Sequence, residues 1–177
     1  MRVHAPGMFT TALILVLSSA SMLAEEKELT LKSPDGALVM RFATRAAKGS
    51  TAVEGRLVYS LAVRGKPVLE ESALGLDLDG AAPLGSSVYI TGSDAGDGVD
   101  DYTLATGKTS HVHEEYRSLT LRVAENGPRG RALTIEARAY NDGVAFRYVL
   151  PEQRPISELR LRQEATEFHF RDRKSVV

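Results

Sequence analysis

The feature that most constrains this chain is a series of short runs in which apolar and polar residues alternate. Alternation with a period of two puts one face of a strand in a core and the other in water. The runs lie at residues 28–32, 37–42, 57–63, 74–79, 113–123, 132–140, 144–150, 156–162 and 166–170. No window shows a convincing helical period of useful length. Many short strands at close spacing predict an all-β fold, a β-sandwich of antiparallel strands.

Turn sequences separate these runs. The motif S-P-D-G at residues 33–36 joins the first two, R-G-K-P at 64–67 follows the third, and N-D-G at 141–143 precedes the run at 144–150. Proline supplies the fixed φ of a turn's second position and glycine supplies a positive φ. We therefore expect hairpin corners at these places.

Residues 91–109 do not follow the alternating pattern. They carry Asp94, Asp97, Asp100 and Asp101 among three glycines at positions 92, 96 and 98. We expect a flexible acidic loop here rather than a strand. Carboxylate oxygens are ligands that Ca²⁺ prefers, but the spacing does not fit the D-x-D-x-D-G pattern, because glycine stands third and the next acid is Asp97. We therefore favour a solvated loop over a calcium site.

Composition excludes several classes of function. The 22 basic and 23 acidic residues give a formal net charge of −1, so no broad basic surface is available for nucleic acid. The absence of cysteine excludes disulfide scaffolds, thiolate catalysis and Cys-ligated zinc. Any catalysis must rest on carboxylates, histidine, tyrosine, lysine or hydroxyl groups.

The N-terminus predicts export. Residues 1–24 contain Arg2, an apolar run at 9–17 that is too short for a membrane span, and small residues before the charged stretch at 25–28. We expect a cleaved signal peptide, with the cut after Ala24 or after Ala20, and a secreted or periplasmic protein. An uncleaved membrane anchor is the alternative. Residues 25–171 then form one domain, and 172–177 match a translated sequencing-library adapter, so we expect a non-native tail and a domain that is incomplete at its C-terminal end.

Two histidines are candidates for metal binding. His111, His113 and Glu115 alternate along one run, so their side chains share a face, and an H-x-H pair on a strand suits a metal ion. The alternative is two surface imidazoles on a solvated strand. Because no third ligand from another element is visible in the sequence, we assign no metal site.

Paired carboxylates are the residues that glycoside hydrolysis requires, with one of the two having a raised pKa. The adjacent pairs Glu70-Glu71 and Glu114-Glu115, and Glu164 with Glu167, are candidates by residue type. Nothing in their neighbourhoods marks a cleft. The chain has neither the G-x-S-x-G elbow of serine hydrolases nor a phosphate loop. We therefore assign no catalytic or cofactor-binding residue.

Six motifs in order resemble the N-terminal domain of glycoside hydrolase family 97. They are L-K-S-P-D-G-A-L-V-M-R-F at 31–42, G-K-P-V at 65–68, S-A-L-G-L at 72–76, Y-N-D-G-V-A-F-R-Y at 140–148, P-E-Q at 151–153 and E-A-T-E-F at 164–168. The chain departs from the family at the acidic segment, where a Trp-rich stretch leading to W-G-E is usual. It departs again at 113–116, where H-E-E-Y replaces R-N-H-Y.

The resemblance implies a β-super-sandwich that packs against a catalytic (β/α)₈ barrel and helps to shape its active site. Family members are secreted or periplasmic, calcium-dependent α-glucosidases and α-galactosidases, which act on oligosaccharides through carboxylates of the barrel. A barrel takes about 250 residues and is not in this sequence. We therefore expect an inactive N-terminal domain that binds no cofactor by itself, with Ca²⁺ belonging to the full-length enzyme. The alternative is a free-standing periplasmic sandwich that binds a carbohydrate or a protein.

Overall fold

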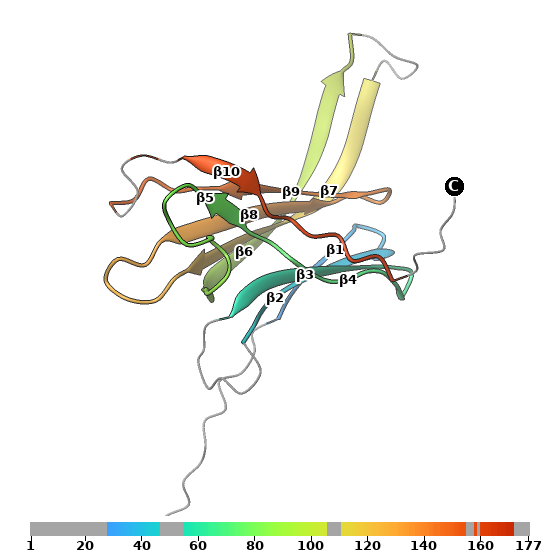
Figure 1. The fold of residues 1–177 in the computed structure, drawn as a ribbon. Coiled ribbons are helices and arrows are strands. Elements are labelled where there is room, and N and C mark those ends of the chain that lie inside the picture. The colour runs from blue at the N-terminus through green and yellow to red at the C-terminus, as the bar shows by residue number, and fades with distance from the viewer. Residues whose placement is uncertain (1–27, 47–54, 106–110, 155–157, 159, 172–177) are drawn as a thin grey trace, which may run out of the picture.

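The computed structural model describes residues 28–46, 55–105, 111–154, 158 and 160–171. The regular elements in these residues are all strands (Figure 1). They are β1 (Leu29–Lys32), β2 (Leu38–Arg45), β3 (Arg56–Val63), β4 (Lys66–Ala73), β5 (Leu76–Leu78), β6 (Tyr89–Thr103), β7 (His111–Ala124), β8 (Ala132–Ala139), β9 (Val144–Val149) and β10 (Leu161–Glu164). Every pairing is antiparallel, in the sheet orders β1-β2-β3-β4, β6-β7-β8-β9 and β5-β10. The prediction of an all-β antiparallel fold is confirmed.

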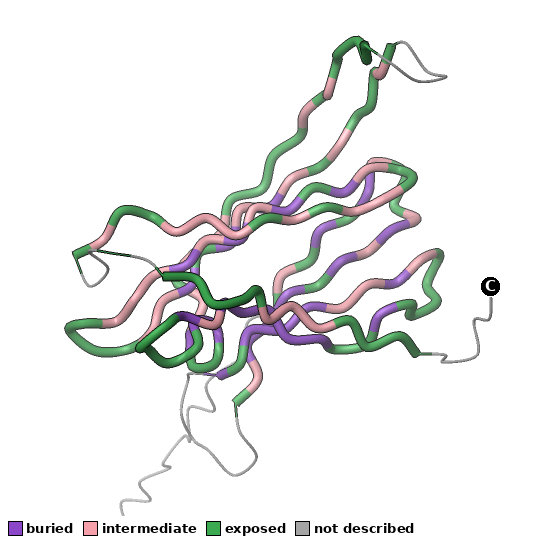
Figure 2. The backbone as a smooth tube through the Cα atoms, turned by 45° about the horizontal axis from the view of Figure 1, so that its top comes forward, coloured by how far each residue is buried: buried purple, intermediate pink, exposed green. Residues whose placement is uncertain are grey.

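The two four-stranded sheets pack face to face around one core. The first sheet contributes the fully buried Met40, Phe42 and Leu57, and the second contributes Leu121 and Ile135 to the same cluster. Figure 2 shows the buried positions alternating along the strands where the two sheets face each other. This arrangement is the sandwich that the period-two pattern predicts.

The S-P-D-G turn between β1 and β2 is held by its own side chains. The Ser33 hydroxyl donates to Asp35 and accepts from the Leu38 amide at 2.9 Å, while Gly36 takes a φ of 74°. The hydrogen bond from Ser33 is the main reason that the pKa of the Asp35 carboxyl lies below its usual value. The Asp35 amide donates to the Asn141 side chain at 2.9 Å, so this turn also contacts the N-D-G turn of the second sheet.

The turn between β3 and β4 consists of Arg64 and Gly65 alone. Both residues have positive φ, 49° and 75°, which is the geometry of a two-residue hairpin whose twist matches its strands. The expected corner is therefore confirmed, but the chain re-enters the sheet at Lys66, and β4 was not expected. Pro67 lies near the start of this edge strand, where a missing amide is tolerated.

The expectation of a flexible loop at residues 91–109 is wrong for its described part. Residues 89–103 form β6, which pairs with β7 from Tyr89↔Ala124 to Thr103↔His111. The glycines do not break the strand, because two of them make room for partners. A Cβ on Gly98 would lie 2.4 Å from the Tyr116 ring, and one on Gly96 would lie 3.1 Å from the Ser118 hydroxyl. The lack of a side chain at Gly98 thus leaves room for the Tyr116 ring on the neighbouring strand.

The C-terminal segment runs beside β4 without forming the expected strand at 166–170. Within the described residues 166–171, its one ladder contact is an isolated bridge between Leu69 and Phe170. Separate backbone hydrogen bonds join it to the sheet, from Glu167 to Ala73 at 2.9 Å and from Glu70 to His169 at 2.8 Å. The amide of His169 is instead taken by a side chain, the Ser72 hydroxyl, which interrupts regular pairing.

Several expectations fall wholly or partly outside the described residues. The expected signal peptide and the expected tail at 172–177 lie there. The run expected at 156–162 is only partly described, and β10 begins at Leu161. Among the described residues, no helix of the length and hydrophobicity needed to cross a bilayer is found.

Candidate functional site on the β6–β7 ribbon

The outer halves of β6 and β7 extend beyond the sandwich as a two-stranded ribbon. Strand β8 pairs with β7 only from Arg117 to Ala124, whereas β6 accompanies β7 as far as His111. We call residues 98–103 and 111–116 the ribbon. Figure 1 shows it projecting from the body, and Figure 2 shows that none of its described residues is buried. Its side chains are therefore available to a ligand or a partner.

One face of the ribbon continues the core-facing side of β7. Alternation along β7 places His111 and His113 on the same side as the buried Leu119 and Leu121. Asp101, which lies opposite His113 on β6, is on this side as well. The predicted common face of the two histidines is confirmed.

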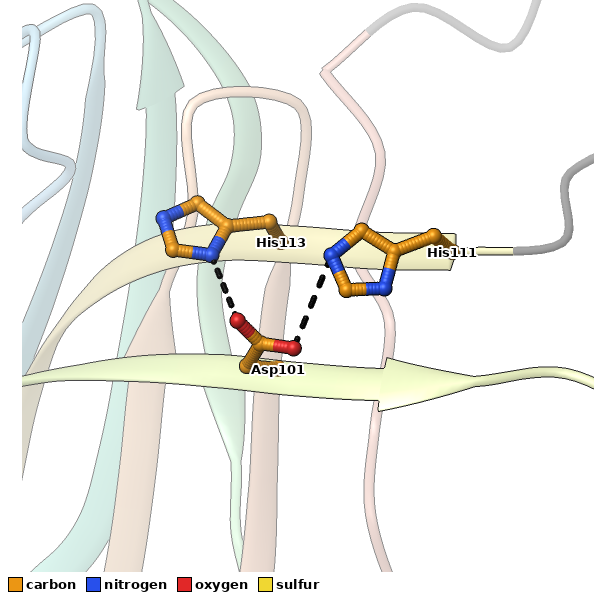
Figure 3. A group of neighbouring side chains, drawn as sticks. All are labelled: Asp101, His111 and His113. Atoms are coloured by element: carbon orange, nitrogen blue, oxygen red, sulfur yellow. Dashed lines mark hydrogen bonds and ion pairs between the residues drawn. The ribbon is translucent and has the colours of Figure 1, made fainter.

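Asp101 lies between the two imidazole rings (Figure 3). One carboxylate oxygen, Oδ2, is 2.9 Å from His113 Nδ1, and the other, Oδ1, is 3.6 Å from His111 Nε2. One potential ligand atom from each residue lies within 4.8 Å of the others. The sequence did not reveal Asp101 as a neighbour, because the segment carrying it was expected to be a loop with no register. Glu115 shares the face but is not a member of this group.

The opposite face of the ribbon carries a different cluster, which braces its base. Asp100 accepts hydrogen bonds from Arg138 at 3.0 Å and from the Tyr140 hydroxyl at 2.7 Å. The Arg138 guanidinium lies 4.2 Å from the centroid of the Tyr116 ring, which packs on Tyr140. Burial raises the pKa of the Tyr140 hydroxyl, and its hydrogen bond to Arg138 raises that of the guanidinium. Nothing in the sequence pointed to this cluster, since Asp100, Tyr116 and Arg138 come from three different strands and Tyr140 follows the third.

The four aspartates of β6 do not converge. Asp94 and Asp100 face one side of the sheet, and Asp97 and Asp101 face the other. Asp94 pairs with Arg122, whose hydrogen bond lowers the pKa of the carboxyl below its usual value. Each of the other three pairs with a cation or an imidazole. Six or more oxygens around one Ca²⁺ ion cannot be drawn from side chains that diverge in this way.

The paired glutamates make structural contacts. Glu71 accepts a hydrogen bond from Arg45 at 2.7 Å, and Glu164 accepts one from Thr166 at 2.5 Å. Glu167 binds the Ala73 amide at 3.1 Å. Glu114 and Glu115 are exposed on the ribbon.

The fold and these pairings define the described part of the chain as an antiparallel β-sandwich domain with a projecting ribbon. The model of the family described as glycosyl-hydrolase 97 N-terminal matches residues 31–177. The chain therefore belongs to this family.

Relatives extend the comparison to longer proteins. A retaining alpha-galactosidase of Bacteroides thetaiotaomicron is 29% identical over 147 residues, which are 83% of this chain and 20% of that protein. A probable retaining alpha-galactosidase of Streptomyces bingchenggensis is 29% identical over 129 residues, covering 73% of this chain and 19% of that protein. The chain thus spans about a fifth of the curated relatives that it matches.

Solved structures show the same relation. A glycoside hydrolase family 97 enzyme from Pseudoalteromonas sp. strain K8, in complex with acarbose, superposes with a TM-score of 0.71 at 26% identity. The match covers 81% of this chain and 20% of the enzyme. A beta-arabinopyranosidase gives a TM-score of 0.67 at 27% identity, and the match covers 80% of this chain and 21% of that one. The sandwich described above is therefore the fold of a segment within these larger enzymes.

Proposed function

We propose that the chain is the N-terminal, non-catalytic domain of a secreted or periplasmic, calcium-dependent α-glycosidase of the α-glucosidase or α-galactosidase type. The observation that carries the proposal is the match of 83% and 73% of the chain to about a fifth of two galactosidases. The remaining four-fifths of such an enzyme has room for a catalytic barrel of about 250 residues.

The contacts of the carboxylates support a non-catalytic role. Glycoside hydrolysis uses two carboxyl groups that flank the scissile bond at a fixed separation, about 5–5.5 Å or about 6.5–9.5 Å. In this chain Glu71 pairs with Arg45, and Glu167 lies against the backbone of β4. These glutamates stabilise the sandwich, and the sugar would bind to the rest of the enzyme. Calcium would likewise be held mainly outside this chain, and export would depend on residues 1–24.

Two measurements test the proposal. The purified chain should not hydrolyse nitrophenyl α-glucoside or α-galactoside, with or without Ca²⁺. Turnover that survives repurification and disappears in Glu114→Gln or Glu115→Gln would contradict it. Genomic DNA beyond codon 171 should continue in frame into a barrel-sized region. A native stop codon there would instead favour the free-standing binding module.

A further inference from the structure

We propose that Asp101, His111 and His113 form a binding site for one divalent transition-metal ion, with Zn²⁺ as the test ion. The proposal rests on the ribbon itself and does not depend on the glycosidase assignment. Two strands supply the ligands, because the H-x-H pair lies on β7 and the carboxylate lies on β6. The sequence alone offered two of the three.

The spacing of the donor atoms fits a small ion. Zinc takes nitrogen and oxygen ligands at about 2.0–2.2 Å in a tetrahedron, which places neighbouring donor atoms roughly 3.3 Å apart. The two oxygens of Asp101 each lie near one imidazole, with Oδ2 at 2.9 Å from His113 Nδ1 and Oδ1 at 3.6 Å from His111 Nε2. All three donors lie within 4.8 Å of one another. Small rotations of exposed side chains are enough to close this set around an ion.

The donor set also selects the kind of ion. Two imidazoles and one carboxylate suit Zn²⁺, Ni²⁺ or Cu²⁺, whereas Ca²⁺ and Mg²⁺ take oxygen ligands almost exclusively. With neutral imidazoles the cluster has a net charge of −1, which attracts a cation. The neighbouring arginines already pair with other carboxylates. Arg117 pairs with Asp97, and Arg138, on the opposite face, pairs with Asp100. The donor set is thus one that suits Zn²⁺ better than Ca²⁺.

The position of the cluster gives the ion a structural effect. A two-stranded ribbon is marginally stable in water, and this one extends past β8 with none of its described residues buried. A metal that joins β6 to β7 at Asp101 and His113 would cross-link the ribbon near its outer end. We therefore expect the bound ion to order the ribbon while leaving the sandwich unchanged.

Zinc titration of the full chain, produced without an affinity tag, tests the site. Calorimetry should show one Zn²⁺ bound per chain, and an excess of Ca²⁺ should not displace it. Asp101→Asn and His113→Gln should each weaken binding by more than the roughly 10- to 100-fold that loss of a mere supporting hydrogen bond costs. Two matched controls should bind as the unaltered chain does: Asp97→Asn, on β6 just inside the base of the ribbon, and His169→Gln, beside β4.

Nuclear magnetic resonance provides a second measurement, in which zinc binding at the two histidines can be told apart from unfolding of a variant. Zinc should shift the imidazole nitrogens of His111 and His113 and leave those of His169 in place. It should also slow amide exchange in residues 98–103 and 111–116. The proposal would be overturned if Asp101→Asn bound zinc as well as the unaltered chain, or if Asp97→Asn lost as much binding as Asp101→Asn. It would also be overturned if Ca²⁺ displaced the zinc, or if only the imidazole of His169 shifted.

Discussion

The hydroxyl of Tyr59 donates a hydrogen bond of 2.9 Å to the backbone carbonyl of Glu167, a residue 108 positions later in the chain. Tyr59 lies on β3 and is 2% exposed, and its ring contacts Phe146 and Phe168 at centroid distances of 5.5 and 6.3 Å. One side chain thus joins the first sheet, the second sheet and the C-terminal segment.

Tyr59→Phe should therefore lower the stability of the domain. The change removes a hydrogen bond and keeps the aromatic packing, so we expect a loss of about 0.5–1.5 kcal/mol in the free energy of unfolding. Urea denaturation followed by circular dichroism measures it. Tyr102→Phe is the control, because Tyr102 is 50% exposed and should change little. Equal effects of the two substitutions would contradict the expectation.

The same tyrosine predicts a loss of stability in alkali. Burial raises the pKa of Tyr59 to about 12, with a further contribution from Tyr148, while an unfolded tyrosine titrates near 10. The folded state favours the protonated form, so its contribution is complete below about pH 10 and is lost between about pH 10 and 12. Unfolding curves at pH 8 to 12 should show this decline.

Tyr59→Phe should make the alkaline decline shallower. It should not remove it, since burial also raises the pKa of Tyr148. An identical pH profile for the variant would show that Tyr59 does not titrate in this way.

Two glycine-to-alanine substitutions should differ sharply in their effect on the free energy of unfolding. A Cβ on Gly55 would lie 2.3 Å from the carbonyl carbon of Arg45, and a backbone atom cannot rotate away as the end of a flexible side chain can. Gly55→Ala should therefore cost about 1–3 kcal/mol, the usual range for overpacking. Gly143→Ala has nothing within 4 Å of the added atom, so its effect should stay within about 0.5 kcal/mol. Thermal denaturation compares the pair, and a reversed order would contradict the geometry.

The ribbon should be removable. Asp97 and Arg117 face each other where β8 ceases to pair, so a two-residue Asn-Gly turn between them would replace residues 98–116. Because no described residue of the ribbon is buried, we expect the midpoint of thermal unfolding to change by less than about 4 °C, and zinc binding to be lost. Failure of this variant to fold would show that the ribbon supports the core.

Self-association should depend on two aromatic side chains near the C-terminal end of the described chain. Phe168 and Phe170 are 57% and 60% exposed, although burying such a ring is worth about 1.5–3 kcal/mol. We expect the isolated chain to associate through them, and Phe168→Ser with Phe170→Ser to reduce light scattering. Val99→Ser, at another exposed apolar position, is the control. A chain that stays monomeric before any substitution would contradict this expectation.

Sequence patterns predicted the parts of the fold in which one strand face is buried. The run that became β8 alternates because every second residue is buried in the core, and the run that became β9 packs Val144, Phe146 and Tyr148 against that core. Strand β6 was missed because none of its residues is buried, and the absence of a side chain at Gly98 is explained by Tyr116 on another strand. The pair His111 and His113 could be found from spacing, but Asp101 could not, since its position depends on the register of two strands.

That register links the ribbon to the core. Strand β7 carries Leu119 and Leu121 into the sandwich and, on the same face, His113 toward Asp101. A slip of one residue between strands would exchange their faces, exposing the leucines and separating the histidine from the carboxylate. The free energy that selects the correct core pairing therefore also sets the geometry of the exposed cluster. Substitutions at the outer end of the ribbon can therefore change what the ribbon binds without altering the strand register that positions its side chains.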